Sequence, residues 1–379
     1  DWAWIKSIKR KTETITMSKR IIFCVTNDLN TDQRMIRICT SLQEAGYNTT
    51  LVGRVLTDSL PLKERVFKQV RLNCFFTKGK FFYLEYNIRL LFWLLFQATD
   101  AICAIDLDTI VPVTIVAKLK GEKLIYDAHE YFPYVPEVIE RPFTQKIWLW
   151  VEKTCLPKCD LVYTVSGSIA NEFEKHYGKP IYTIRNVSFE REWTDIEKPE
   201  KHIIYQGALN TGRGLEQLIT ACKGKDYVLH LYGDGDVKQE LQAMVSRLEL
   251  EKQVLFKGKV SPDELWKETR QAYIGINFAE NKSLSYWLSL SNKLFDYIQA
   301  GVPQIMMNFP EFVALNEPNA FGVVIDDLKP ETIQNAIDSL LNNANLYNQL
   351  RNNCVALRKE LTWENESVKL VQYYHELFK

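Results

Sequence analysis

Short apolar runs alternate with amphipathic stretches along the first half of the chain. IIFCVT at 21–26 has the continuous apolar character of a buried strand. Residues 35–46 have helical periodicity and end at a glycine, and TTLVGR at 49–54 follows as the next strand. A strand, a helix and a strand in this order form a βαβ unit and predict a parallel sheet. The same pattern predicts further strands at 101–105, 123–128, 160–166 and 181–186, and helices at 113–119 and 169–178.

The pattern breaks at a polar, charged stretch after residue 187 and then starts again. Strands are expected at 202–208, 227–233, 254–258, 272–278 and 302–308, with helical patterns between most of them. The sequence therefore predicts an α/β protein of two consecutive doubly wound domains, a number that also suits a length of 379 residues. The expected division is an extension or tag at 1–16, a first domain at 17–190, a linker at 191–202, a second domain at 203–360, and a helix at 361–379 that packs back on the first domain.

Composition places the chain among ordinary globular proteins. Hydrophobic residues make up 46% and charged residues 25% of the sequence, and no secretory signal opens it. The eight cysteines are scattered, and the only close pair, Cys155 and Cys159, has no second pair at zinc-ligand spacing. We therefore expect reduced thiols in a cytoplasmic protein.

Charge is unevenly distributed although 47 Lys and Arg balance 47 Asp and Glu over the whole chain. The first 90 residues hold 16 basic against 8 acidic side chains. This surplus suits an anionic partner, such as a membrane surface or a phosphate-linked acceptor, and equally suits a plain solvated face. The apolar run at 81–98 is interrupted by Glu85, Asn87 and Arg89, so we favour a core helix, with a partly exposed helix that touches lipid as the functional alternative.

The segment SNKLFDYIQAGVPQ at 291–304 carries the best chemical signal. Ser291 is a good N-cap, and Gly301 supplies the C-terminal cap of the helix that follows. Asn292, Lys293 and Asp296 share the first turns of that helix. Lys293 at a helix start can hold a phosphate, and Asp296 can accept two hydrogen bonds from a ribose diol. The spacing is equally that of a surface helix with a Lys–Asp pair.

Two glycine-rich turns follow strands in the second half. The first contains Gly207, Gly212 and Gly214 around Arg213, and the second, weaker one contains Gly233. Glycines allow backbone amides to approach a diphosphate, and Arg213 would stabilise its charge. Many glycine-rich turns are only tight connections between a strand and a helix, so this pattern alone does not identify a diphosphate site.

With these residues in view, the second half resembles the donor domain of glycosyltransferase family 4, of the GT-B fold. The first half resembles the same family, and the resemblance covers about residues 18–375. Its elements occur in the family's order at 25–34, 106–109, 126–137, 163–170 and 184–187.

The resemblance implies two Rossmann-like domains that face each other across a cleft, and a retaining, hexosyltransferase-type reaction. The co-substrate would be a nucleotide-diphosphate sugar, with no cofactor and no metal. The acceptor would be a saccharide or a lipid-linked saccharide in surface-polysaccharide synthesis. Nucleic acid is not an expected partner. The place of action would be the cytoplasm, with peripheral contact to an anionic membrane at its inner face.

The resemblance also assigns roles in the donor domain, with two departures. Arg213 stands where the family has a phosphate-binding Lys, and Lys293 and Asn292 match a branch whose helix begins N-K-L-F-D/E-Y. The family's Arg falls on Ala208, and the first acid of its E-x7-E signature falls on Leu288. The contacts made by those two side chains in the family are therefore missing here.

In the first half, His129 follows a strand where the family places a His near the donor sugar. A neutral imidazole or its backbone carbonyl would contact the sugar, and Glu130 and Asp127 flank it. Glu130 is also a candidate on the acceptor side, with Asp28, Asp32 and Arg34. For Asp32, a role as N-cap of the next helix is an equal alternative.

Asp106-Leu107-Asp108 formally matches the D-x-D motif of metal-dependent transferases, but the doubly wound double domain argues against that use. His129, Arg213 and Lys293 are therefore the expected catalytic residues, with metal ligands absent. Two other functions remain open: a nucleotide-sugar epimerase of the same fold, and a non-catalytic partner of another glycosyltransferase. A glycogen-type phosphorylase is set aside because it needs a pyridoxal lysine and a longer chain.

Overall fold

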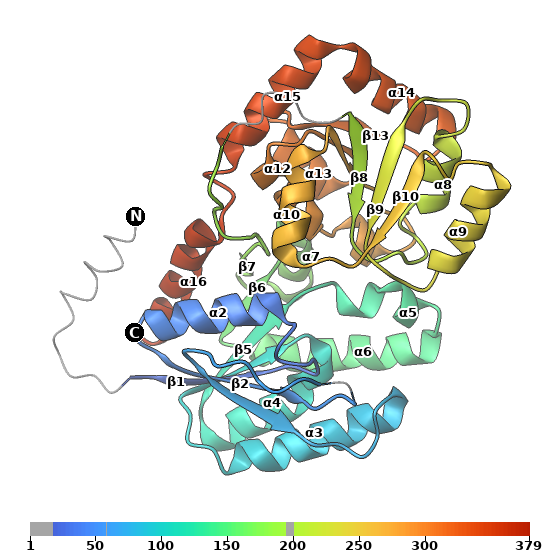
Figure 1. Ribbon diagram of the computed structural model, residues 1–379. Coiled ribbons are helices and arrows are strands. Elements are labelled where there is room, and N and C mark those ends of the chain that lie inside the picture. Colours follow the sequence, from blue (N-terminus) through green and yellow to red (C-terminus); the bar gives the residue numbers. More distant parts are fainter. Residues whose placement is uncertain (1–17, 58, 195–200) are drawn as a thin grey trace. The chain divides into compact units, whose positions relative to one another are not determined.

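The computed structural model describes residues 18–57, 59–194 and 201–379, and these form two compact units (Figure 1). The first unit holds the chain up to Arg185 together with Glu366–Lys379, and the second holds Asn186–Asn365. The predicted extension at 1–16 and part of the predicted linker lie outside the described residues. Each unit is built on one parallel sheet.

The first unit contains a seven-stranded sheet in the order β3-β2-β1-β4-β5-β6-β7, and every neighbouring pair is parallel. The central strands are apolar and buried on both faces, which is why their sequences are continuous apolar runs. From β1 the strands β2 and β3 are added on one side of the sheet, and β4 to β7 are then added on the other side. The strand order therefore reverses between β1 and β4, and ligands of doubly wound folds bind at such a point. The strands are β1 Arg20–Cys24, β2 Asn48–Arg54, β3 Lys68–Leu72, β4 Ala101–Ile105, β5 Lys123–Ala128, β6 Leu161–Thr164 and β7 Tyr182–Thr183.

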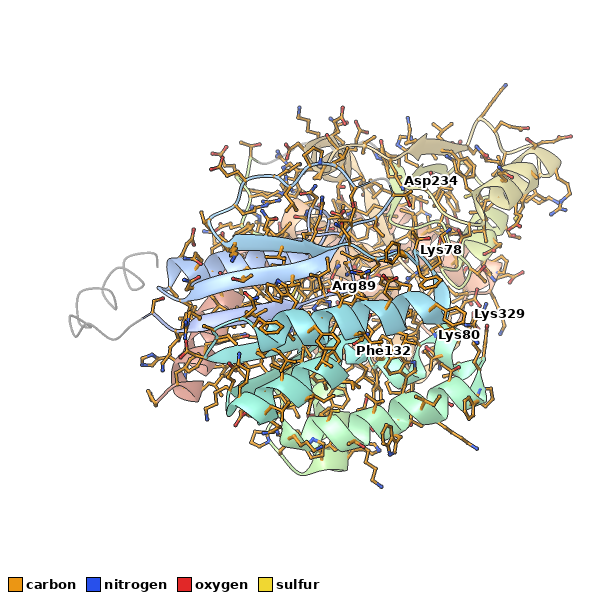
Figure 2. All side chains as sticks on the ribbon, turned by 90° about the horizontal axis from the view of Figure 1, so that it is seen from below. Lys78, Lys80, Arg89, Phe132, Asp234 and Lys329 are labelled. Carbon is orange, nitrogen blue, oxygen red and sulfur yellow. The ribbon has the colours of Figure 1, made fainter. Side chains whose placement is uncertain are left out.

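Helices cover both faces of this sheet (Figure 1). Three of them, α3, α4 and α6, lie side by side in the near layer of Figure 2, with α4 in contact with the other two. The last helix, α16, places Tyr374 in the core, where its hydroxyl lies 3.1 Å from that of Tyr163. The helices are α2 Gln33–Glu44, α3 Gly79–Leu95, α4 Leu107–Lys120, α5 Pro136–Ile139, α6 Pro142–Cys155, α7 Gly167–Tyr177 and α16 Trp363–Leu377, with short 3-10 turns at Phe132–Tyr134 and Leu156–Lys158.

The second unit repeats the plan with a six-stranded parallel sheet in the order β10-β9-β8-β11-β12-β13. Its reversal point lies between β8 and β11. The strands are β8 His202–Gln206, β9 Val228–Tyr232, β10 Val254–Gly258, β11 Ile274–Asn277, β12 Gln304–Met307 and β13 Gly322–Ile325. The helices are α8 Leu215–Ala221, α9 Lys238–Arg247, α10 Pro262–Gln271, α11 Leu284–Trp287, α12 Asn292–Ala300, α13 Pro310–Asn316, α14 Pro330–Asn342 and α15 Ala344–Leu357.

Two parallel sheets with surrounding helices confirm the α/β class and the doubly wound plan of each half. Two strands were not predicted, β3 and β13. The sequence of β3, KQVRL, is mostly polar because this strand lies at the sheet edge and is only partly buried. The strand expected at 181–186 shortens to the two residues of β7.

Across the part of the chain that the structure describes, no helix is long and apolar enough to cross a bilayer. The 17 residues of α3 bury one row of side chains, Phe82, Tyr86, Leu90 and Leu94, spaced four apart. The predicted packing of this segment against the core is therefore confirmed for one face of the helix.

Candidate active site

In the second unit, a glycine follows each of the strands β8 and β9, and the backbones of these two glycines approach closely. Gly207 and Gly233 both have a φ of +138°, a conformation that favours glycine. A Cβ on Gly233 would lie 1.8 Å from the carbonyl oxygen of Gly207, so no other residue fits there. The two predicted glycine-rich turns therefore meet at the carboxyl edge of the sheet, next to its reversal point.

Lys293, in the first turn of α12, reaches the same edge. Its Nζ lies 3.9 Å from the centre of the Tyr205 ring, and 3.7 Å from where a Cβ of Gly207 would be. The Tyr205 hydroxyl donates to the carbonyl oxygen of Ala208 at 2.7 Å, which fixes the ring. Burial, and to a lesser extent the charge of Arg213, lower the pKa of Lys293 to about 7, and Asp296 opposes this shift.

Arg213 follows Gly212 in the loop before α8, and its guanidinium lies 5.1 Å from the centre of the Tyr286 ring. Because it acts on the pKa of Lys293, the two cations are within electrostatic reach of each other. Neither forms an ion pair with a carboxylate of the described residues. Two neighbouring cations that face aromatic rings beside a glycine-lined edge form a site suited to an anion.

The remaining predicted donor residues lie along α12. Asp296 accepts a hydrogen bond from Nε2 of Gln206 at 3.0 Å, and Gln206 accepts one from Thr269 at 2.7 Å. The side-chain oxygen of Asn292 accepts from Asn186 at 3.0 Å. Ser291 occupies the N-cap position as predicted, but its hydroxyl makes no capping hydrogen bond within the described chain.

Gly212 and Gly214 also have positive φ, of 83° and 66°. Gly212 accepts a backbone hydrogen bond from Glu280 at 2.9 Å, so its loop is tied to the segment after β11. Leu288, in place of the family's first acid, is almost fully buried at the end of α11. An apolar, buried side chain at that position offers a sugar no hydrogen bond.

The first unit contains a buried charge cluster at the carboxyl ends of its strands. Arg34 binds Asp127 through two contacts, 2.8 Å from NH2 to Oδ1 and 3.2 Å from Nε to Oδ2, and donates to the carbonyl oxygen of Ile184 at 2.8 Å. Nε2 of His129 lies 3.2 Å from Oδ2 of the same carboxylate. Burial would raise the pKa of Asp127, but Arg34 and His129 outweigh it and hold the pKa below its usual value.

The environment of His129 favours the imidazolium form, whereas the sequence suggested a neutral imidazole. Burial alone would lower its pKa, but Asp127 and Asp106 raise it to about 9. The backbone N–H of His129 donates to Oδ1 of Asp106 at 2.8 Å. Asp106 has a φ of +55°, which is strained for a residue with a Cβ, and burial raises the pKa of its carboxyl group.

Asp28 and Arg34 both have internal partners in this structure, and their predicted contact with an acceptor stays a prediction. Asp28 is 7% exposed, and its carboxylate accepts from Arg71 at 2.8 and 2.9 Å and from the hydroxyl of Ser59. Arg34 is committed to Asp127, as described above. Both residues hold the first unit together, because their charges are satisfied internally.

Of the two interpretations of Asp32, the structure shows the cap: its carboxylate accepts from the backbone N–H of Met35 at 3.1 Å, at the start of α2. Glu130 is partly exposed, and burial, reinforced by Glu137, raises the pKa of its carboxyl group. Asp108 accepts from Thr26 at 2.6 Å. No group of three or more His, Cys, Asp or Glu side chains that could hold a metal occurs in the described residues.

Sequence reasoning missed Tyr205 and Gln206, which contact Lys293 and Asp296. Both precede Gly207 at the end of β8. The rule that ligands bind at the carboxyl ends of parallel strands could have found them. It could have found the strained Asp106 at the end of β4 in the same way.

Comparison with known proteins agrees with this architecture. Residues 187–355 match the family model for glycosyl transferases group 1, and residues 33–187 match the model for glycosyltransferase family 4. A search of curated proteins gave no match. The two family models together cover residues 33–355, and the chain is a glycosyltransferase of this group 1 and family 4 type.

Solved structures show the same fold at low sequence identity. Sucrose-phosphate synthase from Thermosynechococcus elongatus is 15% identical, with a TM-score of 0.78 over 95% of this chain and 99% of that one. HepE from Anabaena, solved in complex with UDP and glucose, is 13% identical, with a TM-score of 0.73 over 94% and 98%. WaaG, a glycosyltransferase involved in lipopolysaccharide biosynthesis, is 12% identical, with a TM-score of 0.71 over 93% and 98%. The fold is therefore GT-B, with two Rossmann-like domains.

Proposed function

We propose that this protein is a retaining glycosyltransferase that takes a hexose from a nucleotide-diphosphate sugar, without a metal ion. The acceptor is a saccharide or a lipid-linked saccharide of surface-polysaccharide synthesis, and the place of action is the cytoplasmic side of the membrane. One observation carries the donor class: Lys293 and Arg213 lie beside aromatic rings at a glycine-lined sheet edge, and among the described residues neither forms an ion pair, although Asp296 lies within electrostatic reach of Lys293.

That observation fits the departure of a diphosphate. As the bond between the sugar and the diphosphate breaks, negative charge grows on the leaving group, and Lys293, Arg213 and backbone amides at the loop would stabilise it. Asp296 would accept hydrogen bonds from the ribose hydroxyls. In a retaining reaction the leaving phosphate itself can take the acceptor's proton. HepE in complex with UDP and glucose supports the donor class, and WaaG, which is involved in lipopolysaccharide biosynthesis, supports the acceptor class.

His129 takes a different part in this proposal from the one that the sequence suggested. As a cation held by Asp127, it would place positive charge and an N–H donor toward a sugar hydroxyl or the leaving group. Because Leu288 is buried and carries no polar group, the donor sugar must be recognised through other residues. The same residue also keeps a non-catalytic partner subunit as a second candidate.

A thermal-shift screen against nucleotide sugars tests the donor class, because specific binding stabilises the fold by RT ln(1 + [L]/Kd). The selected donor is then incubated with saccharide and lipid-linked acceptors, with and without EDTA. We expect transfer that EDTA leaves unchanged and a product that keeps the donor's anomeric configuration by NMR. Donor conversion without an acceptor would indicate the epimerase. Binding of no donor by folded protein would favour the partner subunit.

A further inference from the structure

The helices α3, α4 and α6 of the first unit carry a large group of exposed apolar side chains. We call this surface the apolar face. It contains both aromatic and aliphatic residues, and several are more than half exposed, such as Leu119 at 72% and Trp150 at 66%. Its members are Phe81, Tyr83, Leu84, Ile88, Phe92, Val111, Ile115, Leu119, Phe143, Ile147 and Trp150.

The apolar face follows helical periodicity and so is a continuous feature of these helices. On α4, Val111, Ile115 and Leu119 are spaced four apart and form one stripe. On α3, exposed Ile88 and Phe92 lie opposite the buried row described above, so this helix is apolar on both sides. The three helices lie side by side in the near layer of Figure 2, and their stripes belong to one side of the unit.

The second unit has no comparable surface. Its exposed large hydrophobic side chains among the described residues are Phe189 and Leu284, which are far apart in the sequence. Single exposed apolar residues are normal, whereas a contiguous apolar patch marks an interaction site. The apolar face is therefore expected to bind a partner.

Charge on the same three helices indicates which partner. Lys80, Lys118, Lys146 and Lys153 are exposed. None of the carboxylates on these three helices is free at the surface. Asp108 and Glu152 are buried, and Glu85 is bound by Arg89 at 2.8 Å and by backbone N–H groups. Figure 2 labels Lys80, with Lys78, at the start of α3. Exposed Glu137 and Glu140 precede α6, outside these three helices. An apolar surface whose own helices carry exposed cations and no exposed carboxylate is complementary to a layer of anionic headgroups over hydrocarbon.

We propose that the apolar face binds the surface of an anionic lipid bilayer, with α3, α4 and α6 lying in the interface. A second copy of the chain fits less well, because a twofold contact would bring the same lysines together. Aromatic side chains prefer the interface, and several weak contacts add up to reversible attachment. Membrane binding would bring the enzyme to the lipid-linked acceptors of the proposed function. The evidence for membrane binding is the apolar face itself and does not depend on that function.

Sedimentation with vesicles of phosphatidylglycerol and phosphatidylcholine in equal parts tests this proposal. We expect binding at low salt that weakens as salt is raised. The double variant Lys118→Glu/Lys146→Glu should lower the partition coefficient by about 30-fold, since each cation contributes on the order of 1 kcal/mol and 1.4 kcal/mol is a factor of ten. The matched control, Lys223→Glu/Lys252→Glu, reverses two exposed lysines of the second unit and should bind like the wild type.

A second pair of variants tests the apolar contribution. Leu119→Ser/Trp150→Ser should lower binding by about tenfold or more, because two side chains that enter the interface are lost. Leu60→Ser/Val66→Ser removes two side chains that are 70% and 62% exposed outside the apolar face, and should leave binding unchanged. Equal binding by the face and control variants would overturn the proposal, as would no vesicle binding by folded wild type at low salt. Dimerisation in ultracentrifugation that only the face variants abolish would assign the apolar face to a second copy.

Discussion

The two units of the molecule differ in how their buried or partly buried charged side chains are paired. In the first unit, Arg34 and Asp127 are 3% and 0% exposed and meet in a two-point ion pair, to which His129 adds a third charge. In the second unit, Lys293 and Arg213 lie near each other and face aromatic rings. Charges that satisfy one another hold a fold together, whereas two neighbouring cations that form no ion pair, with the single carboxylate of Asp296 nearby, suit a ligand that brings more negative charge.

The largest expected effect comes from breaking the buried pair of the first unit. Arg34→Met removes the cation and leaves Asp127 buried without its main partner. We expect a loss of about 3–5 kcal/mol in the free energy of unfolding, measured by urea denaturation. The control Lys175→Met removes a surface pair with Glu172 at 2.7 Å and should cost only about 0.2–1 kcal/mol. Equal losses in the two variants would show that the cluster does not stabilise the unit.

The corresponding change in the second unit should affect ligand binding and not folding. Lys293→Met removes a cation that burial already disfavours, so the free energy of unfolding should stay the same or rise. Donor affinity should fall by about 3 kcal/mol, or roughly 150-fold, the upper end for a hydrogen bond to a charged group. Calorimetry measures this loss. Lys225→Met, which removes a lysine paired with Asp338 at 2.6 Å in the segment before β9, is the control and should bind the donor nearly as well as wild type.

A smaller effect on the donor is expected at the carboxylate of α12. Asp296→Asn keeps the shape and removes the charge that would bind the ribose hydroxyls. The loss should be about 1.5–3 kcal/mol in donor affinity. Asp338→Asn, which alters a carboxylate bound to Lys225 and Tyr227, provides a control. If Asp296→Asn binds the donor like the wild type, the role of Asp296 is limited to its contact with Gln206.

The lowered pKa of Lys293 predicts how donor affinity depends on pH. Below about pH 7 the free protein already carries the proton, so affinity should be flat. Above it, the diphosphate favours the charged form and binding must take up a proton, so affinity should fall by up to about tenfold per pH unit. Lys293→Arg stays charged and should abolish this dependence. A wild-type affinity that is constant from pH 6 to 9 would contradict the assignment of Lys293 as the titrating contact.

The contrast between the units also shows how far sequence reasoning reaches. Buried strands were predictable because a strand covered on both faces must be apolar, and Lys293 and Asp296 because one helix carries them at a fixed spacing. The polar edge strand β3 lacks that signal. The role of Arg34 was not predictable, because its partner Asp127 lies 93 residues away and only the fold brings them together.

The central claim is that the cations of the second unit are placed for a diphosphate. The most direct measurement compares the binding of a nucleoside diphosphate with that of its nucleoside, in wild type and in Lys293→Met/Arg213→Met, by calorimetry. The base is the one whose nucleotide stabilises the chain most. We predict that the wild type binds the diphosphate far more tightly and that this preference largely disappears in the double variant, while nucleoside affinity is unchanged. A folded double variant that keeps the full preference would contradict the account.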